Sequence, residues 1–271
     1  MTADVWFRAT FALVGACLGS FLELVWSRSA QGRSVVHPPS ACDACGVGLR
    51  PVDNVPVLSW LWLRGRCRAC GASIPTAHPL IEATSGGLAW LIAARFVPGP
   101  ASLRLPEVAT TVYITLFVGL WFWAALSDVR WRIIPDGASY LAVPVAVAGQ
   151  VALQTLGAAD HVVGWKLSVL GAAAGWLGLG GLSLAWRLVR GREGLGWGDV
   201  RLAALIGAVL GPWPGLWGTL GIASALGAIA GLVSLLVLRR SSYLPLGPFL
   251  AVSATGIAIY GQAISRWWYG V

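Results

Sequence analysis

The chain has 271 residues, of which 57% are hydrophobic and 11% charged, and its mean hydropathy is +0.73. This composition excludes a soluble globular domain with a solvated surface and indicates an all-α, polytopic membrane protein. The net charge of +8 comes from arginines that punctuate hydrophobic spans, which favours anionic membrane lipids over nucleic acid as their counter-charge.

The first apolar run, residues 5–26, is interpreted as a transmembrane helix, and residues 1–26 are assigned to it. It lacks a basic leading region and a small-residue cleavage site, so we do not expect a cleavable signal peptide. Glu23 is unusual because it lies inside the inner end of this span. An ionisable residue there is expected to pair with an arginine, to reach the cytosolic surface or to serve function.

Residues 27–78 form the one long polar insertion, and we expect them to be a cytosolic loop domain. Several prolines discourage long helices in this segment. An insertion of this size is too small to build much of a hydrophobic core without a staple.

Two CxxC motifs supply the staple, at a spacing close to that of four-thiolate zinc sites. Gly46 and Gly71 directly follow the two motifs, where a turn with positive φ favours glycine. The alternatives are two disulfides, which a reducing cytosol disfavours, or a redox motif, which the paired repeat argues against. Four thiolates leave no open position on the ion, so we predict structural zinc. The ligands are Cys42, Cys45, Cys67 and Cys70.

Residues 79–271 are expected to be the membrane catalytic domain, with about seven further helices. Apolar spans of about 20 residues are typical of transmembrane helices. The sixth span is short, and we expect it to borrow length from the preceding turn or to begin in a hydrated cavity. The eight predicted spans are 5–26, 79–97, 107–127, 137–157, 162–186, 200–212, 215–238 and 247–265.

The orientation follows from the positions of the basic residues. Most of the 19 arginines and lysines fall in alternate connections, beginning with 27–78. Because cytosolic connections carry the excess of positive charge, these connections are predicted to be cytosolic and both termini outside. The same count places four carboxylates at the cytosolic ends of helices. They are Asp128, Asp136, Glu193 and Asp199.

The stretch Gly196-Trp197-Gly198-Asp199 and the single residue Asp128 are the strongest candidates for chemistry. Acidic residues near the membrane are costly, and they are retained where they are paired, hydrated or used. The two glycines remove side chains beside the carboxylate, which leaves room for an extended substrate backbone. The alternative for Asp199 is stabilisation of a helix N-terminus.

Two neighbouring carboxylates do not readily ionise together, so they share a proton. The ionised member then takes a proton from water while the other donates to a carbonyl oxygen. Protonation belongs to the coupled pair, and the sequence does not assign acid and base. Two other interpretations stay open: a polytopic transporter with a zinc-stapled regulatory loop, and a methyltransferase or assembly scaffold without protease activity.

Several short motifs occur in an order that is highly specific when they are taken together. In this order the chain closely resembles the type IV prepilin peptidases, membrane aspartic proteases of bacteria. The motifs are Gly19-Ser20-Phe21-Leu22, the two CxxC pairs around 53–60, Leu63 to Cys67, His78 to Glu82, Asp128 to Asp136, Arg192 to Leu202, and Leu246 to Leu250.

The resemblance implies that Asp128 and Asp199 are the catalytic aspartates of an enzyme in the bacterial inner membrane. It implies a prepilin or pseudopilin substrate, whose short basic leader lies in the cytosol before a hydrophobic helix. Many members of the family then methylate the new amino terminus with S-adenosylmethionine.

The chain departs from the family at two positions. Glu23 stands where the family usually has asparagine, which adds a negative charge near the expected path of the leader. Arg201 replaces a common lysine and preserves the charge but not the geometry. A basic leader at a basic cytosolic face requires counter-charges, and the candidates are Glu23, Glu193, Asp43 and Asp53.

Overall fold

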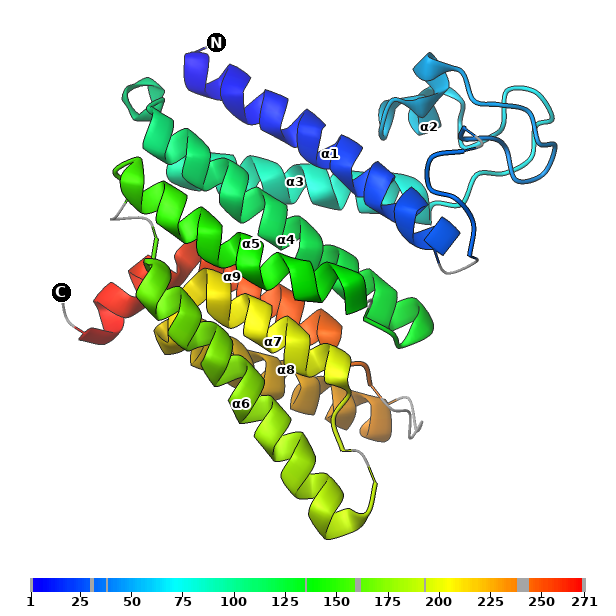
Figure 1. The fold of residues 1–271 in the computed structure, drawn as a ribbon. Helices are drawn as coiled ribbons and strands as arrows, with labels where there is room; N and C mark the ends of the chain where they lie inside the picture. The colour runs from blue at the N-terminus through cyan, green and yellow to red at the C-terminus, as the bar shows by residue number, and fades with distance from the viewer. Residues whose placement is uncertain are drawn as a thin grey trace. The chain divides into compact units, whose positions relative to one another are not determined.

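The computed structural model describes residues 2–29, 32–37, 39–134, 136–158, 162–192, 194–237 and 244–269. The chain forms two compact units, Met1–Ser102 and Leu103–Val271 (Figure 1). Across the described ranges the regular structure is helical, with two isolated β-bridges and no strand. Eight long helices coincide with the eight predicted spans, so the all-α architecture is confirmed. The finer division at residues 26 and 78 stays a prediction.

Unit 1 is built on two long helices, α1 (Ala3–Ser29) and α3 (Ala77–Phe96), which pack against each other. A Cβ atom at Gly15 would lie 2.5 Å from the Cβ of Ala89, so only glycine fits the crossing. Small residues let membrane helices approach where lipid supplies no hydrophobic drive. The connection between the helices holds the 3₁₀ turn Pro51–Asn54 and α2 (Leu58–Trp62).

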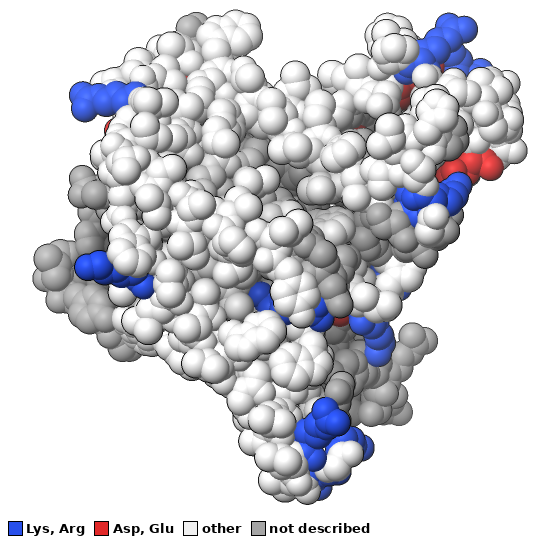
Figure 2. Space-filling model, viewed as in Figure 1, with Lys and Arg blue, Asp and Glu red and all other residues white. Residues whose placement is uncertain are grey.

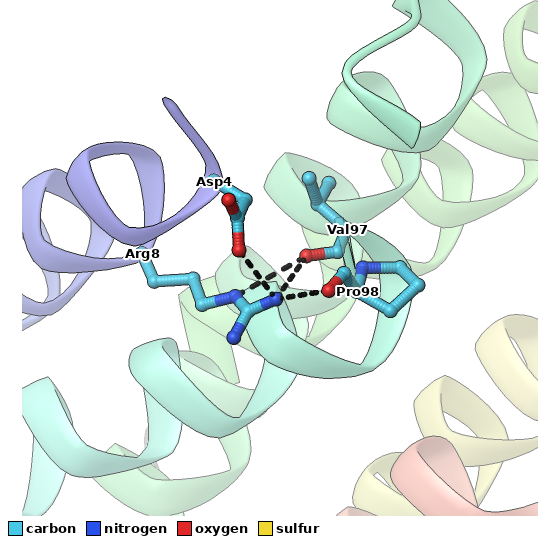
Figure 3. Close-up of polar contacts among 4 residues, drawn as sticks. All are labelled: Asp4, Arg8, Val97 and Pro98. Carbon is cyan, nitrogen blue, oxygen red and sulfur yellow. Dashed lines mark hydrogen bonds and ion pairs between the residues drawn. The ribbon is translucent and has the colours of Figure 1, made fainter. Parts of the chain in front are cut away.

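An arginine closes the end of α3 (Figure 3). The guanidinium of Arg8 on α1 donates to the carbonyl of Val97 at 3.0 Å and to that of Pro98 at 2.5 Å. Asp4 pairs with the same guanidinium at 3.1 Å. Because the last carbonyls of a helix have no intrahelical partner, Arg8 supplies the donors that they lack.

Unit 2 is a bundle in which the short helix α7 lies innermost, between α5, α6 and α9 (Figure 1). Every residue of α7 from Val200 to Val209, apart from the half-buried Arg201, is buried. Its 14 residues rise by about 21 Å, less than the hydrocarbon thickness. A helix covered by protein need not span lipid alone, which explains the short sixth span. The helices are α4 (Leu105–Trp131), α5 (Asp136–Thr155), α6 (Trp165–Arg190), α7 (Trp197–Leu210), α8 (Trp217–Leu236) and α9 (Gly247–Tyr269).

Four stretches of the described helices are long and apolar enough to cross a membrane. Between α7 and α8 the chain kinks over Gly211–Leu216, so one of these stretches contains both helices. Figure 2 shows basic side chains at the C-terminal end of α6, beside a broad uncharged surface. The four stretches are Ala3–Val25, Leu105–Trp131, Trp165–Arg190 and Trp197–Leu236.

A buried amide ties unit 2 together at the end remote from Asp128. Gln150 on α5 is 1% exposed and donates to the carbonyl of Val209 at 2.9 Å and to the hydroxyl of Tyr113 at 3.2 Å. Its own oxygen accepts the N–H of Gly164 at 3.2 Å. Buried polar groups are costly when they are unpaired. This network therefore favours the one packing in which α5 contacts α4, the C-terminal end of α7 and the residue before α6.

Candidate active site and metal centre

The four predicted cysteine ligands come together in unit 1. Their sulfur atoms all lie within 4.8 Å of one another, and the Sγ atoms of Cys42 and Cys70 are 3.9 Å apart. Tetrahedral zinc with Zn–S bonds of about 2.3 Å places its sulfurs about 3.8 Å apart. All four thiols are free, so the residues fit a tetrahedral metal ion and not a pair of disulfides.

The two CxxC motifs adopt the same backbone conformation. The N–H of Gly46 donates to the carbonyl of Cys42 at 2.8 Å, and the N–H of Gly71 donates to that of Cys67 at 2.9 Å. The φ angles of the two glycines are +71° and +72°. The predicted need for glycine after each motif is therefore confirmed, because other residues are strained in this region.

The loop around the cysteines has its own small set of contacts. Arg68 donates to the carboxylate of Asp53 at 2.6 Å. This hydrogen bond holds the pKa of Asp53 below its ordinary value. The indole of Trp60 donates to the carbonyl of Ile74 at 3.2 Å. Asp53 is therefore already neutralised by an arginine, which removes it as a counter-charge for a leader.

Glu23 has a partner that the sequence analysis did not predict. The Nδ1 atom of His78 lies 2.9 Å from its carboxylate, and the Glu23 side chain is only 13% exposed. An arginine partner was one of three alternatives for Glu23, and the partner observed is a histidine, because the packing of α1 against α3 brings His78 to this end. The hydrogen bond to Glu23 raises the pKa of His78, which lies at the start of α3 outside the predicted span.

Glu82, one turn further along α3, holds the cysteine loop. Its carboxylate accepts the N–H of Val57 at 2.7 Å. Val57 has φ +62°, a conformation that a β-branched residue adopts only where other contacts impose it. The interaction docks the segment before α2 onto α3.

Asp128 lies near the C-terminal end of α4 and is 8% exposed. Its Oδ2 atom accepts a hydrogen bond of 2.8 Å from the N–H of Gly247, the first residue of α9. A Cβ atom at Gly247 would lie 2.7 Å from this oxygen. The close approach of α9 to the carboxylate therefore depends on the absence of a side chain.

The turn after Asp128 carries the chain towards α7. The carbonyl of Asp128 accepts the N–H of Arg132 at 3.0 Å, and Arg132 ends α4 with φ +56°. The hydroxyl of Ser127 donates to the carbonyl of Ile133. Ile134 is buried, and its Cβ lies 2.9 Å from where Gly198 would carry its own Cβ. Space predicted for a substrate at Gly198 is thus filled by the protein itself.

Asp199 lies in the first turn of α7 in the same unit. Its Oδ1 atom is buried and has no hydrogen-bond partner among the described residues. Asp128 is near enough to act on it electrostatically. A Cβ at Gly196 would lie 3.5 Å from Oδ2 of Asp199, an ordinary contact, so this glycine leaves the carboxylate uncrowded.

Glu193 and Arg201 both belong to the motif Arg192 to Leu202 that precedes and opens α7. Glu193, a predicted substrate contact, lies outside the described residues. Arg201 is described, and its Nε donates to the carbonyl of Trp197 at 3.0 Å while its guanidinium lies 5.1 Å from the Tyr140 ring centroid. The sequence analysis missed the roles of Gly247 and His78, although both belong to motifs that it quoted.

Comparison with known proteins bears on both halves of the chain. The model of the bacterial peptidase A24 N-terminal domain matches residues 13–96, and the model of the type IV leader peptidase family matches residues 115–232. A protein of Dickeya chrysanthemi, named prepilin leader peptidase/N-methyltransferase, is 36% identical over an alignment of 282 positions, gaps included, that covers 94% of this chain and 93% of its own. The chain belongs to the type IV leader peptidase family.

Two further relatives carry the same name. The protein of Aeromonas salmonicida (strain A449) is 36% identical over 238 residues, which cover 87% of this chain and 76% of its own. That of Burkholderia pseudomallei (strain K96243) is 38% identical over 226 residues, covering 83% and 68%. No solved structure matches.

Membership of the type IV leader peptidase family confirms the protease interpretation of the sequence, and the transporter alternative has no support. The matched region 115–232 contains both aspartates, and the region 13–96 contains the four cysteines. Gly247, which contacts Asp128, falls beyond both matched regions.

Proposed function

We propose that this leader peptidase removes the basic leader from type IV prepilins or pseudopilins at the cytosolic face of the bacterial inner membrane. Asp128 and Asp199 are its catalytic pair. The observation that supports this pair is the packing of Ile134, in the turn after Asp128, against Gly198, the residue before Asp199, within one unit. The names of the relatives support the choice of substrate.

The pair hydrolyses the peptide bond without a covalent intermediate. One carboxylate takes a proton from water as the water oxygen bonds to the scissile carbonyl carbon, and the other carboxyl gives its proton to the carbonyl oxygen. The resulting tetrahedral diol collapses as the first carboxyl returns a proton to the amide nitrogen. The C–N bond then breaks, and the second carboxylate recovers its proton from a hydroxyl.

The remaining predictions fit this arrangement. Both termini lie outside, which puts the ends of α4 and α7 that carry the aspartates at the cytosolic face. Glu23 and Glu193 contribute negative charge for the leader, with Glu23 shared between the leader and His78. Anionic lipids neutralise the remaining arginines.

The four cysteines hold structural Zn2+, which keeps the loop folded and takes no part in hydrolysis. The thiolate set and its tetrahedral spacing support this assignment. The chain also methylates the new amino terminus with S-adenosylmethionine, a proposal that rests on the paired activities in the relatives' names.

The first test is cleavage of a leader-bearing pilin in detergent, read as product mass. Asp128→Asn and Asp199→Asn are each expected to lower turnover at least about 10³-fold, since one remaining carboxyl cannot take a proton from water and give one to the carbonyl oxygen in the same step. Glu107→Gln is the matched control, because it removes a carboxylate at the opposite end of α4. Wild-type turnover in either aspartate variant contradicts the pair. A further methyl mass on adding S-adenosylmethionine tests the second activity.

The leader contact needs a test of its own. Glu23→Arg is expected to raise KM for a basic leader and to leave kcat unchanged, because the contact is made before the chemical step. A leader with reversed charge is expected to restore part of the loss. If KM for Glu23→Arg does not depend on leader charge, Glu23 acts only on His78.

A further inference from the structure

The amino-terminal end of α9 meets one of the two aspartates. The N–H of Gly247 donates to Oδ2 of Asp128 at 2.8 Å. The next residue, Pro248, has no N–H, so Gly247 is the leading donor of this helix end. The free N–H groups and the dipole of a helix N-terminus stabilise negative charge. The Gly247 amide therefore favours the ionised form of Asp128 relative to a carboxyl that has no such donor.

The Oδ1 atom of Asp199 has no such donor among the described residues. Asp199 also lies in a first helical turn, but its own N–H points to the carbonyl of Gly196 at 3.1 Å. Its Oδ1 atom is buried without a partner in the described part of the chain. An ionised carboxylate is costly in this position, whereas a protonated carboxyl carries its own donor for an incoming carbonyl oxygen.

The neighbouring charges act in the same direction. Among the described residues, Arg132 at the end of α4 is the charged group that acts on Asp128, and Asp128 is the charged group that acts on Asp199. Arg132 favours a negative Asp128, and a negative Asp128 disfavours a negative Asp199. The described side chains of α9 from Gly247 to Gly261 include no charge. The only donor that α9 is observed to give the pair is thus the Gly247 amide.

We propose that Asp128 is the ionised member of the pair and Asp199 the protonated member, with Gly247 as the positioning residue that sets this asymmetry. The inference rests on the proposed function of the pair. In the first step Asp128 takes the proton from water, and Asp199 gives its proton to the scissile carbonyl oxygen. In the second step Asp128 returns a proton to the leaving nitrogen, and Asp199 recovers one from the diol.

Chemical labelling of the wild-type protein tests the assignment without any cleavage assay. A small epoxide is opened by an ionised carboxylate and leaves a hydroxyalkyl ester. A small diazo ketone is protonated by a carboxylic acid, and the carboxylate then displaces dinitrogen to form an ester. Peptide masses are expected to show the epoxide on Asp128 and the diazo product on Asp199. The reverse pattern, or both reagents on one residue, overturns the proposal.

The role of Gly247 is tested by the pH profile of kcat/KM on a leader peptide. In Gly247→Ala the new Cβ displaces the carboxyl of Asp128 from the amide, so the acidic limb should move up by about one to two pH units. Gly256→Ala is the matched control, because a Cβ there meets nothing within 4 Å on the same helix. A loss that is equal at every pH, or a shift of the alkaline limb alone, overturns the role of Gly247.

The experiments distinguish an error in the catalytic pair from an error in the acid and base assignment. If Asp128→Asn and Asp199→Asn both cleave normally, the catalytic pair is wrong, whatever the labelling shows. If both variants are inactive but the epoxide labels Asp199, the pair stands and only the acid and base assignment falls.

Discussion

The cysteine loop of unit 1 and the aspartate site of unit 2 are organised in opposite ways. Each CxxC motif makes its own turn, with a glycine at φ +71° or +72°, so the local sequence contains nearly all that its geometry needs. The carboxylate of Asp128 accepts instead a hydrogen bond from an amide of α9. Gly198 in α7 packs against Ile134, which belongs to the turn after α4. The cysteine cluster is built mainly from two local turns, whereas the candidate active site is assembled from separate helices.

The largest effect is expected from removing the metal. If the loop is organised by one centre, a chelator should unfold it while the helices of unit 2 persist, since structural zinc contributes about 10–16 kcal/mol in zinc-finger peptides. Limited proteolysis within 27–78, together with released zinc, measures this. Cys17→Ser is the control, because Cys17 lies outside the cluster. A loop that stays resistant without metal would show that its other contacts suffice.

The network around Gln150 tests whether unit 2 depends on contacts between separate helices. Gln150→Leu leaves the N–H of Gly164 and the carbonyl of Val209 without their partner, and should lower the free energy of unfolding by about 2–4 kcal/mol. Denaturant unfolding in detergent is the measurement. The control is Val151→Leu, at the exposed neighbouring position of α5, where a change within about 0.5 kcal/mol is expected.

The hydrogen bonds of Arg8 at the C-terminal end of α3 make a smaller contribution to the stability of unit 1. Arg8→Ala removes the donors to Val97 and Pro98 and should cost about 1–2 kcal/mol, seen as faster amide exchange in the last turn of α3. Arg8→Lys keeps the charge beside Asp4 but loses the planar fork, so it should restore only part of the protection. Equal exchange in all three proteins would mean that helix packing alone holds this end.

The smallest effect concerns pH and the pair of Glu23 and His78. Since the pKa of His78 is raised in the folded protein, its contribution is fully present below the unfolded pKa of about 6.5 and is lost as pH rises through the folded pKa. His78 is 43% exposed, so the contribution should be below about 1 kcal/mol. Thermal unfolding between pH 5 and 9 measures it, and Glu23→Gln should flatten the dependence. If the pH dependence of thermal unfolding is unchanged in Glu23→Gln, that dependence comes from another titrating group.

Prediction from the sequence succeeded where the signal is local or periodic. The eight predicted apolar spans correspond to eight helices of the structure. The spacing of the cysteines predicted a cluster, and the four sulfur atoms lie within 4.8 Å of one another. Prediction failed at the partner of Glu23 and at the space beside Gly198, because both depend on which helix ends meet. The type of a residue does not determine which residue of another helix it contacts.

The sequence by itself determined the membrane class, the number of apolar helices, the four candidate metal ligands and the two candidate aspartates, since each rests on hydropathy, spacing or residue chemistry. Only the tertiary structure decided that Glu23 pairs with His78 and that α9 delivers the Gly247 amide to Asp128. In the part of the chain that the structure describes, it also left Oδ1 of Asp199 without a corresponding donor. The physical reason is that hydrogen bonds act over about 3 Å, and helix packing alone brings such distant segments within that reach.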